Sequence, residues 1–179
     1  MNLRDPRVYI PEENLPTWEQ ASQGIIIPRE KVEEVALNLR RSGKTIVTLN
    51  GSFDLMHAGH LYMIHRASLL ADCLILALNT DRSIQNYKSK DRPIVPLKWR
   101  LQMAAALRFV SYVTSFDEPD PRAILELIKP DIHVNGAEWG QNCIEREVVE
   151  RNGGKLHIVE RIEGLSTTEL IAKIQTLTS

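Results

Sequence analysis

Two histidines three residues apart, His57 and His60, are the side chains of this sequence best suited to chemistry. They close the stretch Asn50-Gly-Ser-Phe-Asp-Leu-Met-His-Ala-Gly-His60, which lies between an apolar run at 45–49 and a helical pattern at 61–71. Residues three apart share a face at a helix start, where backbone N–H groups and the helix dipole favour phosphate. Two imidazoles there can donate hydrogen bonds to one phosphoryl group. The pattern therefore predicts stabilisation of charge during attack on the α-phosphate of a nucleoside triphosphate.

A second hydroxyl-rich cluster, Gly164-Leu-Ser-Thr-Thr168, opens the last helical pattern of the chain. A helix N-terminus with the hydroxyl groups of Ser166, Thr167 and Thr168 is suited to bind the β- and γ-phosphates. An ordinary N-cap is the alternative, and both can hold at once, because one hydroxyl can cap while the others bind. Two phosphate sites indicate a ligand with several phosphates.

Other interpretations of the histidine pair are helix-start polarity or a metal site. Zinc on a helix usually takes histidines four residues apart plus a third ligand, and the sequence indicates no such set, so no protein-bound metal is expected. His65, His133 and His157 lack a comparable context and are predicted to be structural or surface residues. A phosphate nucleophile is already ionised near neutral pH, so the absence of an obvious general base fits transfer to a phosphate.

Composition narrows the class of protein. The 179 residues have a net charge of −1 and are 43% hydrophobic, which predicts one α/β domain with a full core and no nucleic-acid partner. The two cysteines, Cys73 and Cys143, form no Cys-x-x-Cys pair, so neither structural zinc nor a disulfide framework is expected. The sequence shows neither a signal peptide nor an apolar stretch near the roughly 20 residues that span a membrane. A cytoplasmic protein without a membrane partner is expected.

Strand-like and helix-like segments alternate along the chain, which predicts a parallel sheet with helices on both faces. Residues 1–27 are rich in proline and are expected to form an N-terminal arm, followed by the main domain at 28–179. Short apolar runs predict five strands at 45–50, 73–78, 111–116, 131–135 and 155–160. Periodic segments predict helices at 28–41, 57–71, 97–109, 120–129, 143–151 and 166–177, with a polar segment before the third of these. Ligands bind such sheets at the carboxyl ends of the strands, where Asn50 to His60 lies.

The two clusters together resemble the signatures of the cytidylyltransferase-like nucleotidyltransferases, His-x-Gly-His near the first strand and a Ser-Thr-Thr cluster late in the chain. The resemblance covers about residues 29–177 and implies the Rossmann-like, doubly wound fold of that superfamily. Within it, the chain is most similar to heptose 1-phosphate adenylyltransferases. The supporting stretches are 43–50, 77–83, 88–93, 116–121 and 152–155.

The resemblance also implies roles for matching residues. His57, His60 and Lys88 would be catalytic, with Lys88 in a polar segment that closes over the reaction. Asp54 would hold its loop rather than take part in chemistry, and Lys90 has no assigned role. The nucleotide would be bound by Asn50, Gly51, Ser52, Phe53, His57, Gly59, His60, Gly136, Ser166, Thr167 and Thr168. The acceptor would be bound by Asn79, Asp81, Arg92 and Arg100. The alternative for Asn79 and Asp81 is that they hold the closing segment, and the alternative for the basic residues is a solvated charged face.

The implied reaction transfers AMP from ATP to D-glycero-β-D-manno-heptose 1-phosphate, giving ADP-heptose for lipopolysaccharide and releasing pyrophosphate. Mg²⁺ would accompany the triphosphate, and the working form would be a homodimer. Two features favour a rival cytidylyltransferase that uses CTP and glycerol 3-phosphate or another phospho-alcohol. Asn135 replaces a lysine usual in the heptose enzymes, and Arg161 resembles a cytidylyltransferase feature. A third interpretation is a catalytically silent binding or assembly module, which the intact polar clusters argue against.

Overall fold

Five parallel strands form a single sheet in the computed structural model, which describes residues 11–140, 142–160, 162, 164 and 166–177. The order of the strands across the sheet is β3-β2-β1-β4-β5. The strands are β1 (Ile46–Gly51), β2 (Cys73–Asn79), β3 (Tyr112–Phe116), β4 (Ile132–Gly136) and β5 (Lys155–Val159). All five predicted strands are confirmed within one residue at each end. Their residues are mostly buried because helices cover both faces, so each strand is a short apolar run.

The helices lie where the 3.6-residue periodicity predicts them, with two additions. They are α1 (Trp18–Ala21), α2 (Val32–Arg41), α3 (Ala58–Ser68), α4 (Asp81–Tyr87), α5 (Leu97–Ala105), α6 (Arg122–Ile128), α7 (Arg146–Arg151) and α8 (Thr167–Leu177). Two short 3-10 turns, η1 (Glu12–Asn14) and η2 (Arg29–Lys31), precede α1 and α2. The additions are α1, in the predicted arm, and α4, in the segment predicted to be only polar. Thr80 caps α4 by accepting a hydrogen bond from the backbone of Ser83.

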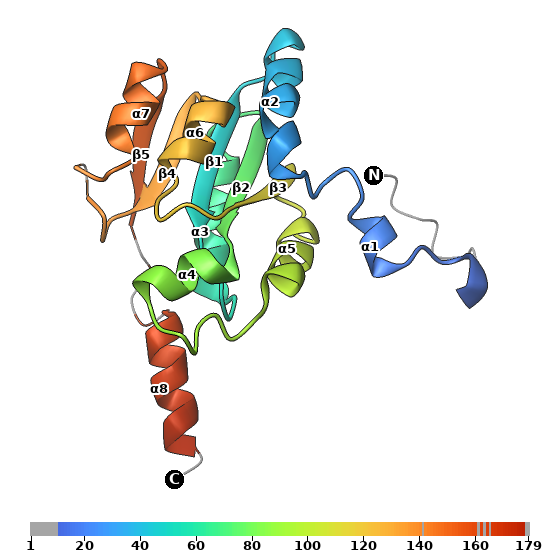
Figure 1. The fold of residues 1–179 in the computed structure, drawn as a ribbon, viewed down its shortest axis with the longest axis vertical. Helices are drawn as coiled ribbons and strands as arrows, with labels where there is room; N and C mark the ends of the chain where they lie inside the picture. The colour runs from blue at the N-terminus through green and yellow to red at the C-terminus, as the bar shows by residue number, and fades with distance from the viewer. Residues whose placement is uncertain (1–10, 141, 161, 163, 165, 178–179) are drawn as a thin grey trace.

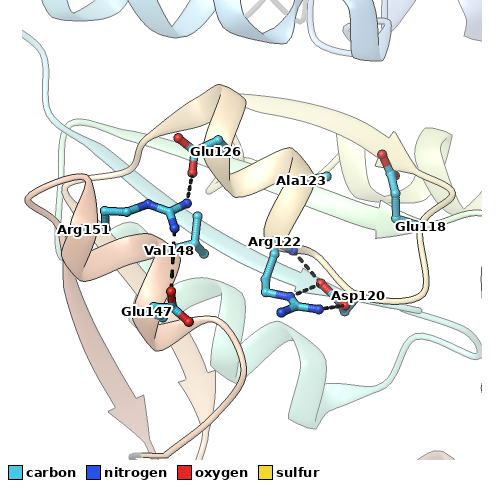
Figure 2. Close-up of a pocket in the computed structure, with 8 residues that line it drawn as sticks. All are labelled: Glu118, Asp120, Arg122, Ala123, Glu126, Glu147, Val148 and Arg151. Carbon is cyan, nitrogen blue, oxygen red and sulfur yellow. Dashed lines mark hydrogen bonds and ion pairs between the residues drawn. The ribbon is translucent and has the colours of Figure 1, made fainter.

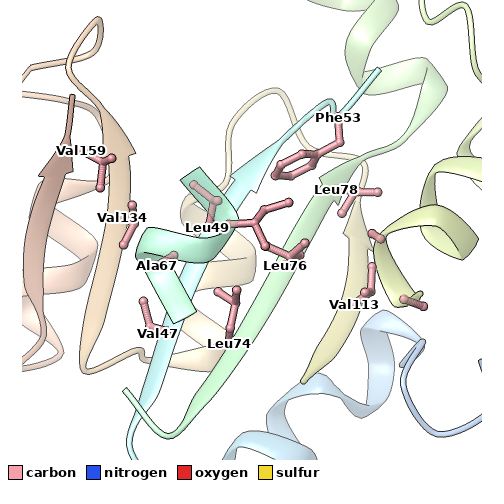
Figure 3. Close-up of a cluster of buried hydrophobic side chains, with 13 residues drawn as sticks. Val47, Leu49, Phe53, Ala67, Leu74, Leu76, Leu78, Val113, Val134 and Val159 are labelled. Carbon is pink, nitrogen blue, oxygen red and sulfur yellow. The ribbon is translucent and has the colours of Figure 1, made fainter. Parts of the chain in front are cut away.

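The sheet is the middle layer of three, as Figure 1 shows. Helices α3 and α5 pack on one face, and α2 and α6 pack on the other. The larger core cluster lies on the α3 side, where Val47, Leu49, Leu76 and Val134 project from neighbouring strands (Figure 3). This arrangement confirms the predicted Rossmann-like, doubly wound fold.

The strand order reverses between β1 and β4. From β1 the chain builds outward through β2 to β3, and then it returns to place β4 on the other side of β1 and β5 beyond it. In open parallel sheets, such a reversal leaves a crevice at the carboxyl ends of the two central strands. Asn50 and Gly51 end β1 at this point, and Asn135 and Gly136 end β4.

The described part of the predicted arm, residues 11–27, packs against the edge of the sheet. Val113 of β3 donates a backbone hydrogen bond to Ile25 (2.9 Å) and accepts one from Ile27 (2.8 Å). Trp18 stacks on Trp99 of α5, with ring centroids 5.5 Å apart. The arm therefore covers the exposed edge of β3 and contacts α5. Residues 1–10 of the predicted arm lie outside the described residues.

The last helix, α8, extends away from the sheet toward the C-terminus (Figure 1). None of its residues is buried, and Ile174 and Leu177 are exposed. Among the described residues, no helix has the length and apolar character needed to span a bilayer.

Candidate active site

A cleft of about 430 Å³ opens where the strand order reverses. Its floor is formed by the ends of β1 and β4, and its walls come from α3, α4 and the segments before α6 and α7. The lining residues are Leu49, Asn50, Gly51, Ser52, Phe53, His60, Met63, Asn79, Tyr87, Lys88, Pro119, Asp120, Pro121, Asn135, Gly136, Glu138, Trp139, Ile144 and Glu145. The position fits the ligand crevice expected of a doubly wound sheet.

The histidine pair stands at the start of α3. His57 is the N-cap in extended conformation, and its Nδ1 atom accepts a hydrogen bond from the backbone of Gly59 (3.1 Å). The Nδ1 atom of His60 accepts one from the backbone of His57 (3.3 Å), and the two ring centroids are 3.9 Å apart. Because both Nδ1 atoms accept, the neutral rings carry their protons on Nε2. Each ring is thus oriented as an Nε2–H donor, which is the role predicted for a phosphate contact.

The loop between β1 and α3 is held in an uncommon backbone conformation. Phe53 and Leu55 both have φ of 47°, in the left-handed region. The Phe53 ring is buried, and its centroid lies 5.5 Å from that of His60. A Cβ on Gly51 would lie 3.4 Å from the same ring, which shows that the ring packs against the end of β1. The loop therefore supports the histidines through packing as well as through its backbone.

Asp54 joins this loop to a segment far along the sequence. Its fully buried carboxylate accepts hydrogen bonds from Arg92 Nε (2.7 Å) and from the backbones of Ile94 (3.0 Å) and Val95 (2.9 Å). Burial alone would raise the pKa of Asp54, but these hydrogen bonds and the Arg92 charge outweigh it and lower the pKa. The predicted structural role of Asp54 fits this geometry, although the segment it holds is 92–95 rather than its own turn. Arg92 is predicted to bind the acceptor, but in the structure its guanidinium forms an ion pair with Asp54.

Lys88 closes α4 and reaches into the cleft. Its Nζ atom donates a hydrogen bond to Ser52 Oγ (3.2 Å), which places an ammonium group beside the β1 loop. Burial and the neighbouring positive charge of Arg92 lower the pKa of Lys88. Tyr87, the preceding residue, also lines the cleft, and burial raises the pKa of its hydroxyl. A partly desolvated ammonium interacts strongly with a phosphate that enters the cleft.

Arg100 lies beneath the cleft rather than in it. Its fully buried guanidinium donates to the backbone oxygens of Val95 (2.9 Å), Ser52 (2.7 Å) and Asn79 (2.8 Å), and to the Asp81 carboxylate (2.6 Å). This arrangement ties together the ends of β1 and β2 and the starts of α4 and α5. The structure thus places Arg100 where it organises the walls of the site, whereas the sequence pattern predicts a direct contact with the acceptor.

Asn79 and Asp81 serve the same network. The Asn79 amide donates to Ser83 Oγ (3.0 Å), and its side chain is buried at the cleft wall. Asp81 accepts from the backbone of Leu97 (2.9 Å) as well as from Arg100. Of the four residues predicted to bind the acceptor, Asn79 alone is among the residues that line the cleft.

The hydroxyl cluster at the start of α8 approaches the β1 loop. Thr167 Oγ1 donates to the backbone oxygen of Asp54 (3.2 Å), and Ser166 Oγ accepts from the backbone of Glu169 (3.2 Å). Ser166 therefore caps the helix, while Thr168 is exposed. The two predicted phosphate-binding clusters, distant in sequence, are thus neighbours in the fold. Gly136, at the end of β4, is covered by the Glu138 carboxylate at the place where a Cβ would lie.

A second depression, of about 440 Å³, lies beside the cleft between α6 and α7. Most of its charged side chains pair with one another: Arg122 with Asp120, and Arg151 with Glu126 and Glu147 (Figure 2). Glu118 pairs with Arg29 outside it. Exposed pairs of this kind make a solvated charged surface. The cleft at the strand-order reversal is therefore the better candidate for an active site.

Several cleft residues were not predicted from the sequence, among them Tyr87, Trp139 and Glu145. Tyr87 could have been predicted, because it is next in sequence to Lys88, which was predicted to lie in the site. Trp139 and Glu145 follow β4, the other central strand, and the rule that strand ends line such a crevice could have indicated them. Nothing in their own types or spacing distinguishes them from surface residues.

Comparison with known proteins agrees with this geometry. The bifunctional protein HldE of Syntrophotalea carbinolica is 37% identical over 147 residues, which cover 82% of this chain and 30% of that protein. HldE of Gluconobacter oxydans is 36% identical over 162 residues, covering 90% of this chain and 34% of that protein. This chain thus spans about a third of the length of these relatives.

Solved structures share the fold. A lipopolysaccharide core biosynthesis protein from Thermoplasma volcanium superposes with a TM-score of 0.55 and 25% identity, covering 67% of this chain and 98% of that one. A pantoate-beta-alanine ligase from Francisella tularensis has a TM-score of 0.59, covers 87% of this chain and 78% of its own, and is 13% identical, which indicates the fold alone. The cytidylyltransferase-like family model matches residues 48–173, which include both predicted signatures. The chain belongs to the cytidylyltransferase-like family.

Proposed function

We propose that this chain transfers AMP from ATP to D-glycero-β-D-manno-heptose 1-phosphate, forming ADP-heptose and pyrophosphate. The observation that carries the proposal is the close histidine pair at the start of α3, with both Nδ1 atoms accepting backbone hydrogen bonds. The choice of ATP and a heptose phosphate rests on the sequence resemblance to heptose 1-phosphate adenylyltransferases and on the similarity to HldE proteins.

The sugar phosphate attacks the α-phosphate, and the bond to the leaving pyrophosphate breaks. Nε2–H groups of His57 and His60 donate to the non-bridging oxygens, where negative charge grows in the transition state. The Lys88 ammonium, which donates to Ser52 in the β1 loop, stabilises the same charge. The nucleophile is an ionised phosphate, so no protein group has to remove a proton. These residues thus bind and orient the reactants and stabilise charge.

Thr168 and the N-terminus of α8 hold the β- and γ-phosphates, with Ser166 as the cap. Thr167 keeps the helix against the β1 loop through the Asp54 backbone. Arg100, Asp81, Asn79 and Arg92 act as positioning residues, because their polar groups hold the cleft walls together. The loop residues Asn50, Gly51, Ser52 and Phe53, with Gly59 and Gly136, bring backbone close to the nucleotide.

Magnesium fits this site as a companion of the triphosphate. Among the described residues, no group of three or more histidine, cysteine or acidic side chains could hold a metal ion. Mg²⁺ is commonly held by substrate phosphates and few protein ligands, so the ion would arrive with the nucleotide. When bound, it neutralises charge on the triphosphate.

The working form is proposed to be a cytoplasmic homodimer. The exposed apolar residues Ile174 and Leu177 of α8 support association, because an isolated helix of eleven residues gains little stability by itself. Light scattering on the purified protein tests the assembly, and a monomer at micromolar concentration would contradict it.

Pyrophosphate release tests the reaction. ATP and CTP are each combined with heptose 1-phosphate and with glycerol 3-phosphate, in the presence of Mg²⁺. The proposal predicts release with ATP and heptose 1-phosphate only. Release with CTP and glycerol 3-phosphate would instead identify a cytidylyltransferase. Arg161, the residue of the sequence that favours this alternative, lies outside the described residues. Silence in all four mixtures would contradict nucleotidyl transfer to either acceptor.

A further inference from the structure

Charge is unevenly distributed along the cleft. The wall formed by α3 and α4 contributes His60 and the Lys88 ammonium, whereas the segment between β4 and α7 contributes the carboxylates of Glu138 and Glu145 and the Trp139 ring. A nucleotide has phosphates at one end and an aromatic base at the other. Phosphates avoid carboxylates and favour the cationic wall. The base therefore belongs at the end of β4, beside Glu145.

Glu145 is almost completely buried, which is unusual for an acidic residue. Only 7% of its surface is exposed, and its Oε2 atom accepts a hydrogen bond from Asn135 Nδ2 (3.2 Å). It stands at the N-cap position of α7, where a side chain ordinarily accepts from the helix backbone, yet it makes no such bond. Its carboxylate lines the cleft instead of serving its own helix.

The described neighbours of Glu145 form no ion pair with it. Among the described residues, a neutral amide, that of Asn135, donates to its carboxylate, and Arg122, which pairs with Asp120, acts on it only through its charge. The Cys143 thiol lies beside the same pair, and burial raises the pKa of that thiol, so it stays a neutral, weak donor. A lysine at position 135, usual in the heptose enzymes, would put a positive charge next to this carboxylate. Asn135 orients the carboxylate without that charge.

A buried carboxylate that lacks a cationic partner is costly unless donors satisfy it. An ionised carboxylate accepts hydrogen bonds only, so a ligand group that meets it must be a donor. The 6-amino group of adenine and the 4-amino group of cytosine are donors. The oxygens at the same places in hypoxanthine, guanine and uracil are acceptors and would be repelled.

We propose that Glu145 selects the nucleobase by accepting a hydrogen bond from its ring amino group, with Asn135 holding the carboxylate in place. The inference rests on the proposed nucleotide chemistry of this cleft and names the class of base that it takes. Adenine is selected over hypoxanthine, and cytosine over uracil.

ATP and inosine triphosphate (ITP) are the matched probes, because ITP has an oxygen in place of the 6-amino group that Glu145 would read, with a hydrogen added on the adjacent N1. Binding of each to the purified chain with Mg²⁺ is measured by calorimetry, without an acceptor. The expected preference for ATP is about 10- to 100-fold, the range of a hydrogen bond to a charged group. In Glu145→Gln, whose amide can donate to an oxygen, the preference falls to a few-fold. Glu147→Gln, an exposed neighbour on α7, keeps the full preference and is the control.

Equal binding of ATP and ITP by the unaltered chain would overturn the inference, and this arm needs no variant to fold. An unchanged ATP preference in a folded Glu145→Gln would also overturn it, because another group would then read the base. Tight ATP binding without discrimination leaves the proposed reaction standing, whereas failure to bind either nucleotide contradicts both proposals.

Discussion

His133 provides a quantitative test of which histidines are structural. It lies fully buried in β4, and its Nδ1 atom is 2.8 Å from Thr48 Oγ1. The Nε2 atom has no hydrogen-bond partner among the described residues. Burial disfavours the charged ring and lowers the pKa of His133 from 6.5 to about 3. The folded protein therefore keeps this ring neutral at pH values where the unfolded chain protonates it.

The sign of the effect follows from proton uptake. Between pH 6.5 and 3 the unfolded state binds a proton that the folded state does not, so the free energy of unfolding decreases as the pH falls. A pH of 4.5 is two units below the pKa of the ring in the unfolded chain, so that ring is protonated. The ring in the folded protein is still neutral at this pH. At about 1.4 kcal/mol per unit, the His133 contribution to this loss is about 3 kcal/mol.

Urea unfolding at pH 7.5 and pH 4.5 measures this loss. His133→Asn removes the titrating ring and keeps an amide group that can bond to Thr48. The unaltered protein should lose about 3 kcal/mol more than the variant between the two pH values. Acidic residues that titrate near pH 4 contribute to both proteins, so they cancel in the difference. The same pH dependence in both proteins would refute the argument that burial keeps His133 neutral.

Three further changes test the site. His60→Ala should lower turnover by about 10² or more while the thermal midpoint stays near that of the His65→Ala control, and near-normal turnover would remove His60 from the mechanism. Lys88→Met should slow the chemical step about 10- to 100-fold, with Lys90→Met as the matched control. Because the pKa of Lys88 is lowered, activity should decline with rising pH below the ordinary lysine range, and Lys88→Arg should move that decline upward. Asp54→Ala should reduce the free energy of unfolding by about 3 kcal/mol, since it leaves the Arg92 guanidinium without its buried partner; a loss below 1 kcal/mol by urea unfolding would contradict this role.

The strands were predictable because burial on both faces makes each a short apolar run. Cys73–Asn79, for example, has six fully buried residues in a row after its first. Helix α4 was not predicted, because its seven residues are mostly polar and too few to show a clear period. The start of α7 was placed too early, since residues 143–145 are apolar or acidic like a helix start, but Ile144 and Glu145 line the cleft before the helix begins at Arg146.

The histidine pair and the Ser-Thr-Thr cluster were predictable because helix starts carry local signals. Long-range partners were not. Asp54 and Arg92 are 38 residues apart, and only the folded chain shows that they bind each other. Arg100 is the clearest case: the resemblance implies a contact with the acceptor, whereas in the fold the arginine is fully buried and acceptors from three separate segments enclose it.

The position of bond cleavage tests the central claim most directly. Phosphorus NMR of the chain with Mg²⁺, ATP and heptose 1-phosphate identifies every phosphorus product in one mixture. Attack on the α-phosphate predicts pyrophosphate and a sugar-linked diphosphate in equal amounts, both lost in His60→Ala. ADP with orthophosphate, or with a newly phosphorylated sugar, would show cleavage at the γ-phosphate and contradict the account.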